Sequence, residues 1–173
     1  MSLPLAGLRI IAVEHYGAGP YGTGFLADLG ADLIKIENRQ MGGDMSRGVG
    51  PHYLGEGDSL FFQALNRNKR SIGLDLTKPE GREVLSRLLD EADILIENYK
   101  TGTMEKWGLG YDDVLAEKYP SLIHCRISGY GADGPLGGFP GYDAIVQSMA
   151  GWLSINGGAE KEPTRVGIAA VDM

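Results

Sequence analysis

The sequence predicts an α/β fold in which a parallel sheet is flanked by helices. Short apolar runs alternate with amphipathic helical segments along most of the chain, and this alternation is typical of βαβ units. Residues 31–38 and 92–98 share one pattern, Ala-Asp, a mostly apolar stretch and Glu-Asn, and each follows a predicted helix. Glycine provides 27 of the 173 residues, which favours many tight turns over a helical bundle.

The composition excludes several functional classes. Sixteen basic and 23 acidic residues give a net charge of −7, so we expect no nucleic-acid partner and no membrane-surface partner. A single cysteine excludes an internal disulfide and is typical of a cytoplasmic protein. From the first residues we expect no signal peptide, and no apolar run in the sequence approaches a membrane span. Because it stops directly after an apolar segment, we expect it to be a fragment of a longer protein.

Apolar patterning predicts five strands and six helices along the chain. The strands are expected at 8–14, 31–37, 71–76, 93–97 and 122–128. The helices are expected at 21–29, 59–66, after a capping box at 77–80, and at 101–107, 112–119 and 142–152. A polar segment, 38–58, is long for an unstructured connection and is expected to be functional. In the last strand we expect Ile123, Cys125 and Ile127 to face inward, with Cys125 an inert core thiol.

Polar and aromatic residues follow four of the predicted strands directly. In a parallel sheet these carboxyl ends meet at one edge, where ligands bind. The four segments that should therefore lie close together are 15–17, 37–39, 98–100 and 128–130.

The glycine-rich turn at residues 17–22 allows two interpretations. Gly17, Gly19 and Gly22 match the G-x-G-x-x-G dinucleotide fingerprint, and Glu37 stands near the expected acidic position. This pattern would make the chain an NAD-dependent oxidoreductase. Pro20 removes a backbone donor from the turn and is unfavourable for phosphate binding. Alternatively, the glycines serve only a tight strand-to-helix turn.

Other residue types give weaker signals. The three histidines have no carboxylate or cysteine at ligand spacing, so no metal site is expected. Asp172 follows the uncharged, largely apolar segment 166–171. Partial desolvation there would make it a reactive carboxylate. From the residue types alone, an exposed aspartate at the start of a further helix is the favoured alternative.

Several motifs together, in order and spacing, resemble one known family. They are 5–10 (L-x-G-L-R-I), 18–20 (A-G-P), 29–37 (L-G-A-D-L-I-K-I-E), 43–47 (G-D-x-x-R), 68–76 (N-K-R-S-I-x-L-D-L), 93–99 (D-x-x-I-E-N-Y), 128–131 (S-G-Y-G) and 141–151 (G-Y-D-x-x-x-Q-x-x-x-G). The chain resembles the N-terminal portion of class III coenzyme A transferases, the CaiB/BaiF group, and the resemblance covers essentially all 173 residues.

The resemblance implies a Rossmann-like parallel sheet flanked by helices that binds coenzyme A and carries the catalytic residue. In the family a second, smaller domain follows, absent from this chain, and two subunits form an interlocked homodimer. The family's nucleophile matches Asp172. By analogy it attacks an acyl-CoA, and a small carboxylic acid receives the CoA. Coenzyme A is then a substrate, with no tightly bound cofactor.

The resemblance also carries over the binding residues. Those matching the family's CoA contacts are Asn38, Arg39, Leu74, Asn98, Tyr99, Lys100 and Lys106. Those matching its substrate side are His15, Tyr16, Gly17, Ala18 and Tyr142. Lys106 stands where the family often has arginine, and Gly17 where some members have glutamine. The family includes acyl-CoA racemases, and a non-catalytic CoA-binding or scaffold domain is a further alternative.

Overall fold

The computed structural model of this chain describes residues 2–158, 160 and 162–173 and contains a five-stranded sheet. The strands are β1 (Arg9–Val13), β2 (Asp32–Glu37), β5 (Arg70–Gly73), β6 (Ile94–Glu97) and β7 (Ile123–Arg126). They are ordered β5-β2-β1-β6-β7, and every neighbouring pair is parallel. The predicted α/β fold with a parallel sheet is confirmed.

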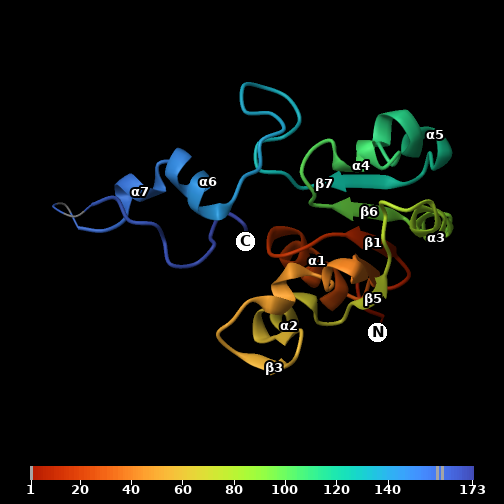
Figure 1. The fold of residues 1–173 in the computed structure, drawn as a ribbon, viewed down its shortest axis with the longest axis horizontal. Helices are drawn as coiled ribbons and strands as arrows, with labels where there is room; N and C mark the ends of the chain where they lie inside the picture. Colours follow the sequence, from red (N-terminus) through yellow and green to blue (C-terminus); the bar gives the residue numbers. More distant parts are fainter. Residues whose placement is uncertain (1, 159, 161) are drawn as a thin grey trace.

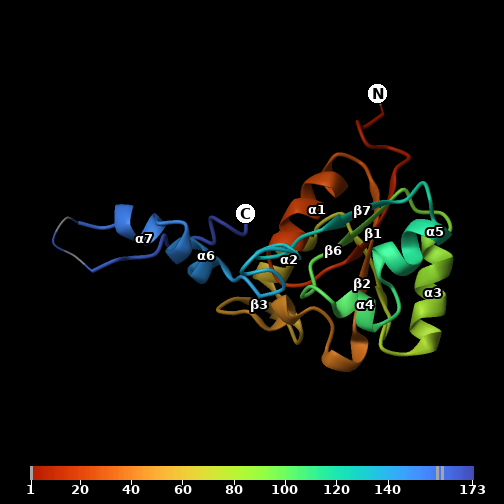
Figure 2. The same cartoon turned by 90° about the horizontal axis from the view of Figure 1, so that it is seen from above.

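Helices cover both faces of the sheet (Figure 2). One face packs against α1 (Ala18–Asp28), and the other packs against α3 (Pro79–Leu89), α4 (Thr103–Lys106), the π-helical turn η3 (Tyr111–Leu115) and α5 (Ala116–Lys118). In β1, Ile10 and Ala12 belong to the core beneath α1, while Ile11 and Val13 belong to the core on the α3 face. A strand buried on both faces is expected to be a continuous apolar run, as β1 is.

The strand order reverses beside β1. The chain runs from β1 outward to β2 and β5, then crosses back to β6 and β7 on the other side of β1. The connections that follow β1 and β6 therefore diverge at the carboxyl edge. In open α/β sheets this switch point forms the ligand crevice.

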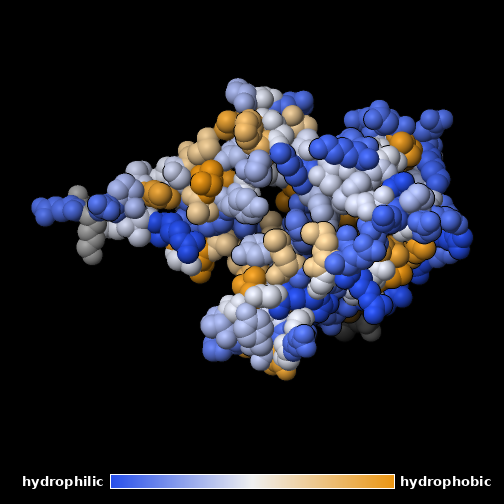
Figure 3. Space-filling view, in the orientation of Figure 1, coloured by the Kyte–Doolittle hydropathy of each residue, from blue (hydrophilic) through white to orange (hydrophobic). Residues whose placement is uncertain are grey.

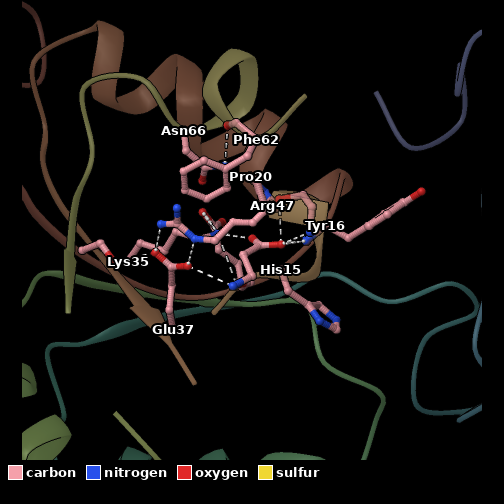
Figure 4. A network of polar contacts seen from close by, with 12 residues as sticks. His15, Tyr16, Pro20, Lys35, Glu37, Arg47, Phe62 and Asn66 are labelled. Atoms are coloured by element: carbon pink, nitrogen blue, oxygen red, sulfur yellow. Dashed lines mark hydrogen bonds and ion pairs between the residues drawn. The ribbon is translucent and has the colours of Figure 1, made fainter. Parts of the chain in front are cut away.

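The polar segment 38–58 is not an unstructured loop. It forms the 3₁₀ turns η1 (Arg39–Met41) and η2 (Met45–Gly48) and a small hairpin of β3 (Tyr53–Gly55) and β4 (Asp58–Ser59), and α2 (Leu60–Asn66) follows. Arg47 fastens the segment to the sheet, since Nε and Nη2 each donate to the Glu37 carboxylate at 2.8 Å (Figure 4). The Arg47 guanidinium also lies 3.7 Å from the centre of the Phe62 ring.

The predicted capping box before α3 is wrong. Lys78 is the N-cap of α3, and no side chain caps the helix. Thr77 is engaged elsewhere, because its N–H and Oγ1 both donate to Asp75 Oδ1, at 3.0 and 2.6 Å. The Asp75 carboxylate therefore accepts the Thr77 N–H that the Glu80 side chain would accept in a capping box.

The predicted burial of Ile123 and Cys125 is also wrong, whereas Ile127, the third residue predicted to face inward, is half-buried and packs against the core beneath α1. Ile123 is 62% exposed and Cys125 is exposed, whereas His124 and Arg126 are half-buried. Ile123 and Cys125 are in register with Ile94 and Ile96 of β6, so they share the α1 face. No helix in the described part of the chain covers that face as far as β7. Strand alternation predicts which side chains share a face but not whether that face is covered.

An arm extends from the sheet domain after β7 (Figures 1 and 2). It contains α6 (Asp143–Met149) and α7 (Trp152–Ile155), separated at Gly151, whose φ of 82° ends the single helix expected over 142–152. The polar residues Ser154–Pro163 are also predicted from the sequence to form a hairpin-like segment, but residues 159 and 161 within it lie outside the described residues. The chain then returns from the arm toward α1.

Across residues 2–158, 160 and 162–173, every helix is too short or too polar to traverse a lipid bilayer.

The lowered pKa of the Glu37 carboxyl group predicts that the protein loses stability as the pH falls. Burial raises its pKa, but hydrogen bonds from Arg47, Ser71 and the Asp44 N–H outweigh burial and lower the pKa from 4.5 to about 2. This stabilisation is complete above the unfolded-state pKa and is lost as the pH falls from 4.5 toward 2. Glu37→Gln should reduce the free energy of unfolding by about 3 kcal/mol more at pH 7 than at pH 2.

Urea titrations of both proteins across this pH range measure the difference. The control is Glu83→Gln, because Glu83 forms only an exposed ion pair with Arg87 and should change the unfolding free energy by less than about 0.5 kcal/mol. An effect of Glu37→Gln that does not vary with pH would contradict the prediction.

Candidate active site

A cavity of about 750 Å³ lies between the carboxyl edge of the sheet and the arm. The molecular surface is hollowed between these two parts (Figure 3). Five chain segments line the cavity: the turn between β1 and α1, η2 at Met45, the segment after β6, the loop after β7, and the arm with the returning C-terminal residues. Nine of the residues predicted from the sequence lie in its wall, namely His15, Tyr16, Gly17, Ala18, Asn98, Tyr99, Lys100, Tyr142 and Asp172.

Asp172 faces the glycine turn. A Cβ built on Gly17 would lie 3.6 Å from Asp172 Oδ2, so the carboxylate stands beside the N-cap of α1. No side chain caps this end of the helix, and its first turn contains no acidic residue. The positive end of the helix dipole is therefore directed at the place where an anion would form.

Two buried polar residues of α6 hold the segment that leads to Asp172. Asp143 is 7% exposed and Gln147 is fully buried. Asp143 accepts the Val171 N–H at 2.9 Å. Gln147 accepts the Val166 N–H at 2.9 Å and donates to the Ile168 carbonyl and to Asp143. A segment with little apolar burial is thus fixed by hydrogen bonds to a helix.

The surroundings of Asp172 favour the protonated form of its carboxyl group more than bulk water would. Burial is the main cause and the negative charge of Asp143 adds to it, so the pKa of Asp172 is raised above 3.8. A carboxylate with a raised pKa is more basic and less strongly solvated, and both properties increase its nucleophilicity.

Asn98 fixes the backbone of His15. Its Oδ1 accepts the His15 N–H at 2.8 Å, and its Nδ2 donates to the His15 carbonyl at 2.9 Å. The His15 ring stacks on Tyr99, with ring centroids 4.6 Å apart. Burial lowers the pKa of His15, so the imidazole is neutral at pH 7. Because the oxygen and the nitrogen of the Asn98 side-chain amide both bind His15, Asn98 contributes to the site by fixing the backbone of the turn between β1 and α1.

A cluster of four buried charges lies beneath the glycine turn (Figure 4). We call it the charge cluster; it consists of Glu14, Lys35, Asp44 and Lys69, whose side chains are each at most 1% exposed. Lys35 Nζ lies 2.7 Å from Asp44 Oδ2, and Lys69 Nζ lies 2.9 Å from Glu14 Oε1. Burial raises the pKa of Asp44, but Lys35 and the N–H groups of Ser46 and Tyr16 outweigh it and lower the pKa overall.

A second ionic contact orients the segment after β6. The Glu97 side chain is 2% exposed, and its Oε2 accepts the Tyr99 N–H at 2.8 Å. Arg126 joins Glu97 to Glu105 of α4, at 2.8 and 2.6 Å. Burial raises the pKa of Glu97 despite this arginine. The contact fixes the backbone of Tyr99, which forms part of the cavity wall.

The remaining residues predicted to bind CoA lie outside the main cavity. Asn38 and Leu74 line a small adjoining cavity with Tyr99 and Trp107. Asn38 also caps η1 by accepting the Gln40 N–H. Arg39 and Lys106 line neither cavity, and with Lys100 they form an exposed set of cations.

The geometry argues against the nicotinamide interpretation of the glycine turn. A Cβ on Gly19 would meet Asn98 Cγ at 3.0 Å and Glu14 Cβ at 3.1 Å, so protein side chains occupy the close approach that the fingerprint reserves for pyrophosphate. Gly22 has no heavy atom within 4 Å of a Cβ position. Glu37, the candidate ribose ligand, is buried and bound to Arg47 and Ser71.

Within the described ranges, no three His, Cys, Asp or Glu side chains come together in a way that could hold a metal ion.

Sequence reasoning missed the residues that position the site. Asp143 and Gln147 appear in the quoted motif without a role, and Lys35, Asp44 and Lys69 were not assigned one. One signal was available: Asp143 and Gln147 are polar residues four apart on a predicted helix, so they share a face. The charge cluster left no comparable signal, because its members come from four separate segments.

The family model described as CoA-transferase family III matches residues 5–173. The chain belongs to CoA-transferase family III, as its sequence motifs indicated.

Named relatives and solved structures agree with this assignment. The chain is 43% identical to succinate–glutarate CoA-transferase of Agrobacterium fabrum, covering 98% of this chain and 43% of that protein. It is also 43% identical to acetyl-CoA:oxalate CoA-transferase of Acetobacter aceti, covering 95% and 41%. A CaiB/BaiF family protein from Brucella suis superposes with a TM-score of 0.92 at 41% identity, over 100% of this chain and 46% of that chain. The chain spans a little under half the length of these proteins.

Close backbone packing at the cavity rim predicts the effect of one substitution. A Cβ on Gly129 would lie 2.3 Å from the Gly141 nitrogen, a distance that neither backbone can tolerate. Gly129→Ala should push apart the backbone segments at Gly129 and Gly141 and displace Tyr142, which follows Gly141. We expect the free energy of unfolding to fall by about 2 kcal/mol. Thermal unfolding of the full-length protein measures the loss.

The matched control is Gly22→Ala on α1. An added Cβ there meets nothing, and alanine favours the helix by about 0.5–1 kcal/mol. Equal thermal stabilities for the two variants would refute the role of the Gly129–Gly141 contact.

Proposed function

We propose that the whole protein is a class III CoA transferase and that Asp172 is its nucleophile. The observation that carries the proposal is the placement of a half-buried carboxylate with a raised pKa beside Gly17, in the wall of a 750 Å³ cavity. Ionised Asp172 attacks the acyl-CoA thioester carbonyl, forming a mixed anhydride and releasing CoA thiolate. The thiolate attacks the aspartyl carbonyl, which gives an aspartyl-CoA thioester and frees the first acid.

The second half of the reaction reverses these steps with a different acid. The incoming carboxylate attacks the aspartyl-CoA thioester, forming a second mixed anhydride and CoA thiolate. The thiolate then attacks the acyl carbonyl of the substrate, giving the new acyl-CoA and restoring the Asp172 carboxylate. Each tetrahedral intermediate carries an oxyanion, and the uncapped start of α1 at Gly17 and Ala18 is suited to stabilise it.

The cavity and the exposed cations suggest how CoA binds. Lys100, Lys106 and Arg39 provide local positive charge for the CoA phosphates in an otherwise acidic protein. The small cavity of Asn38 and Leu74 beside Tyr99 has a volume of only about 20 Å³, so its rim contacts the edge of the adenine and does not enclose the ring. The acyl group extends from there toward His15, Tyr16 and Tyr142, which line the main cavity.

We propose a small dicarboxylic acid as the acceptor. The names of the similar proteins refer to succinate and glutarate or to oxalate, and all three are short dicarboxylates. A panel of acyl-CoA donors and mono- and dicarboxylic acceptors, analysed by liquid chromatography, identifies the pair.

The rest of the protein is proposed to form a second domain and to complete an interlocked homodimer in the cytoplasm. The relatives are about twice as long as this chain. Apolar side chains exposed on the arm, including Ile145, Met149 and Ile155, and those exposed on β7 provide surfaces for these contacts.

Replacement of Asp172 tests the mechanism. Asp172→Asn in the full-length protein should reduce kcat for CoA transfer by at least about a thousandfold, because an amide cannot form the anhydride. Hydroxylamine added during turnover should modify Asp172 alone, detected by mass spectrometry of the peptide that contains Asp172. Turnover close to that of the unmodified protein, or a label on another residue, would refute the assignment.

Reactivity of Cys125 tests the proposed covering of β7. In residues 1–173 expressed alone, the exposed thiol should react rapidly with a maleimide. In the full-length protein the modification of the Cys125 peptide should be slower by at least about tenfold, because the added chain covers the strand. Similar rates in both proteins would contradict the proposed packing.

A further inference from the structure

The turn between β1 and α1 contains an unusual backbone conformation. Tyr16 has a φ of 66°, in the left-handed region that residues with a Cβ rarely adopt. Gly17 follows it directly and faces Asp172. The direction in which the Gly17 backbone points therefore depends on keeping Tyr16 in a conformation that a tyrosine does not favour.

The Asp44 carboxylate makes the contact that holds Tyr16. Its Oδ1 accepts the Tyr16 N–H at 3.0 Å. Ser46 fixes the same oxygen through its N–H at 2.8 Å and its Oγ at 2.7 Å. The other oxygen, Oδ2, lies 2.7 Å from Lys35 Nζ. The side chain is completely buried, so water cannot replace these partners.

The neighbouring backbone groups are held by other side chains. Lys35 Nζ donates to the Glu14 carbonyl at 3.2 Å, and Asn98 binds both backbone groups of His15. Lys35 and Asn98 thus hold the backbone of Glu14 and His15 in place. Among the side-chain hydrogen bonds of the described residues, only that of Asp44 holds the Tyr16 backbone, and so it is the last such restraint before Gly17. The Tyr16 ring itself packs against Phe61, with ring centroids 5.6 Å apart.

We propose that Asp44 is a positioning residue for CoA transfer: by holding Tyr16 in the left-handed conformation it sets the Gly17 backbone against the Asp172 carboxylate. The consequence for turnover rests on the proposed function, whereas the effect on the turn does not. The role differs from general stabilisation, because it requires an acceptor at one oxygen and not the ion pair as such.

Two double variants of the full-length protein separate the acceptor from the charge. Lys35→Met with Asp44→Asn removes both charges but keeps a side-chain oxygen for the Tyr16 N–H. Lys35→Met with Asp44→Leu removes both charges and the oxygen while keeping a side chain that branches at Cγ. Since neither variant leaves a buried charge unpaired, their difference reports on the Tyr16 contact and on the local turn at Ser46.

Kinetics and hydrogen exchange give independent readouts. Relative to the Asn variant, the Leu variant should have a kcat at least tenfold lower, with the KM for acyl-CoA changed less than threefold, because misplacement affects the reacting geometry. The amide of Tyr16 should exchange at least tenfold faster. Adding Tyr16→Gly to the Leu variant should recover part of the lost kcat, since glycine adopts a positive φ without strain.

The outcomes distinguish this proposal from the proposed function. An unmodified protein without CoA transfer activity overturns the function, and exchange at Tyr16 then still tests the turn. Equal kcat and equal Tyr16 exchange in the two double variants overturn the role of Asp44. If either variant fails to fold by circular dichroism, the unmodified protein decides: rapid exchange of the Tyr16 amide, at the rate of an open loop, overturns the proposal, and slow exchange supports it.

Discussion

Ion pairing among four buried charges is the constraint on which the site depends. Glu14, Lys35, Asp44 and Lys69 balance two positive and two negative charges at the carboxyl edge of the sheet. Burying any one of them without a partner would be costly. The cluster therefore ties together the end of β1, the strand β2, the segment 38–58 and the start of β5. The charge cluster binds backbone groups of the glycine turn directly and so holds the turn in place.

A similar principle applies to the arm, with hydrogen bonds in place of ion pairs. The segment before Asp172 has few apolar contacts of its own, and Ile168 is 65% exposed. Asp143 and Gln147 hold three of its backbone groups from α6. Residues from the two ends of the chain thus meet in one cavity. The adjoining apolar surfaces on α6 and α7, including Ile145, Met149 and Ile155, are exposed in this chain.

The glycine turn illustrates how one local pattern serves different ligands. Its spacing satisfies the dinucleotide fingerprint, and its strand–turn–helix setting is the expected one. Tertiary contacts determine its use. Asn98 fills the approach above Gly19, and Arg47 occupies the Glu37 carboxylate. What remains accessible is the start of α1 facing Asp172, a geometry suited to an oxyanion.

The sequence by itself determined the parallel α/β fold, the family and nine of the residues that meet in the main cavity. The spacing of apolar residues that predicts helices and strands is a property of the local sequence. The order and spacing of the motifs identify the family. It did not determine that β7 exposes Ile123 and Cys125, that Thr77 turns back to Asp75, or that the expected 142–152 helix breaks at Gly151. It also gave no indication of the charge cluster. Only the tertiary structure decided these features, because burial and ion pairing depend on segments distant in the chain and on whether a neighbouring element is present.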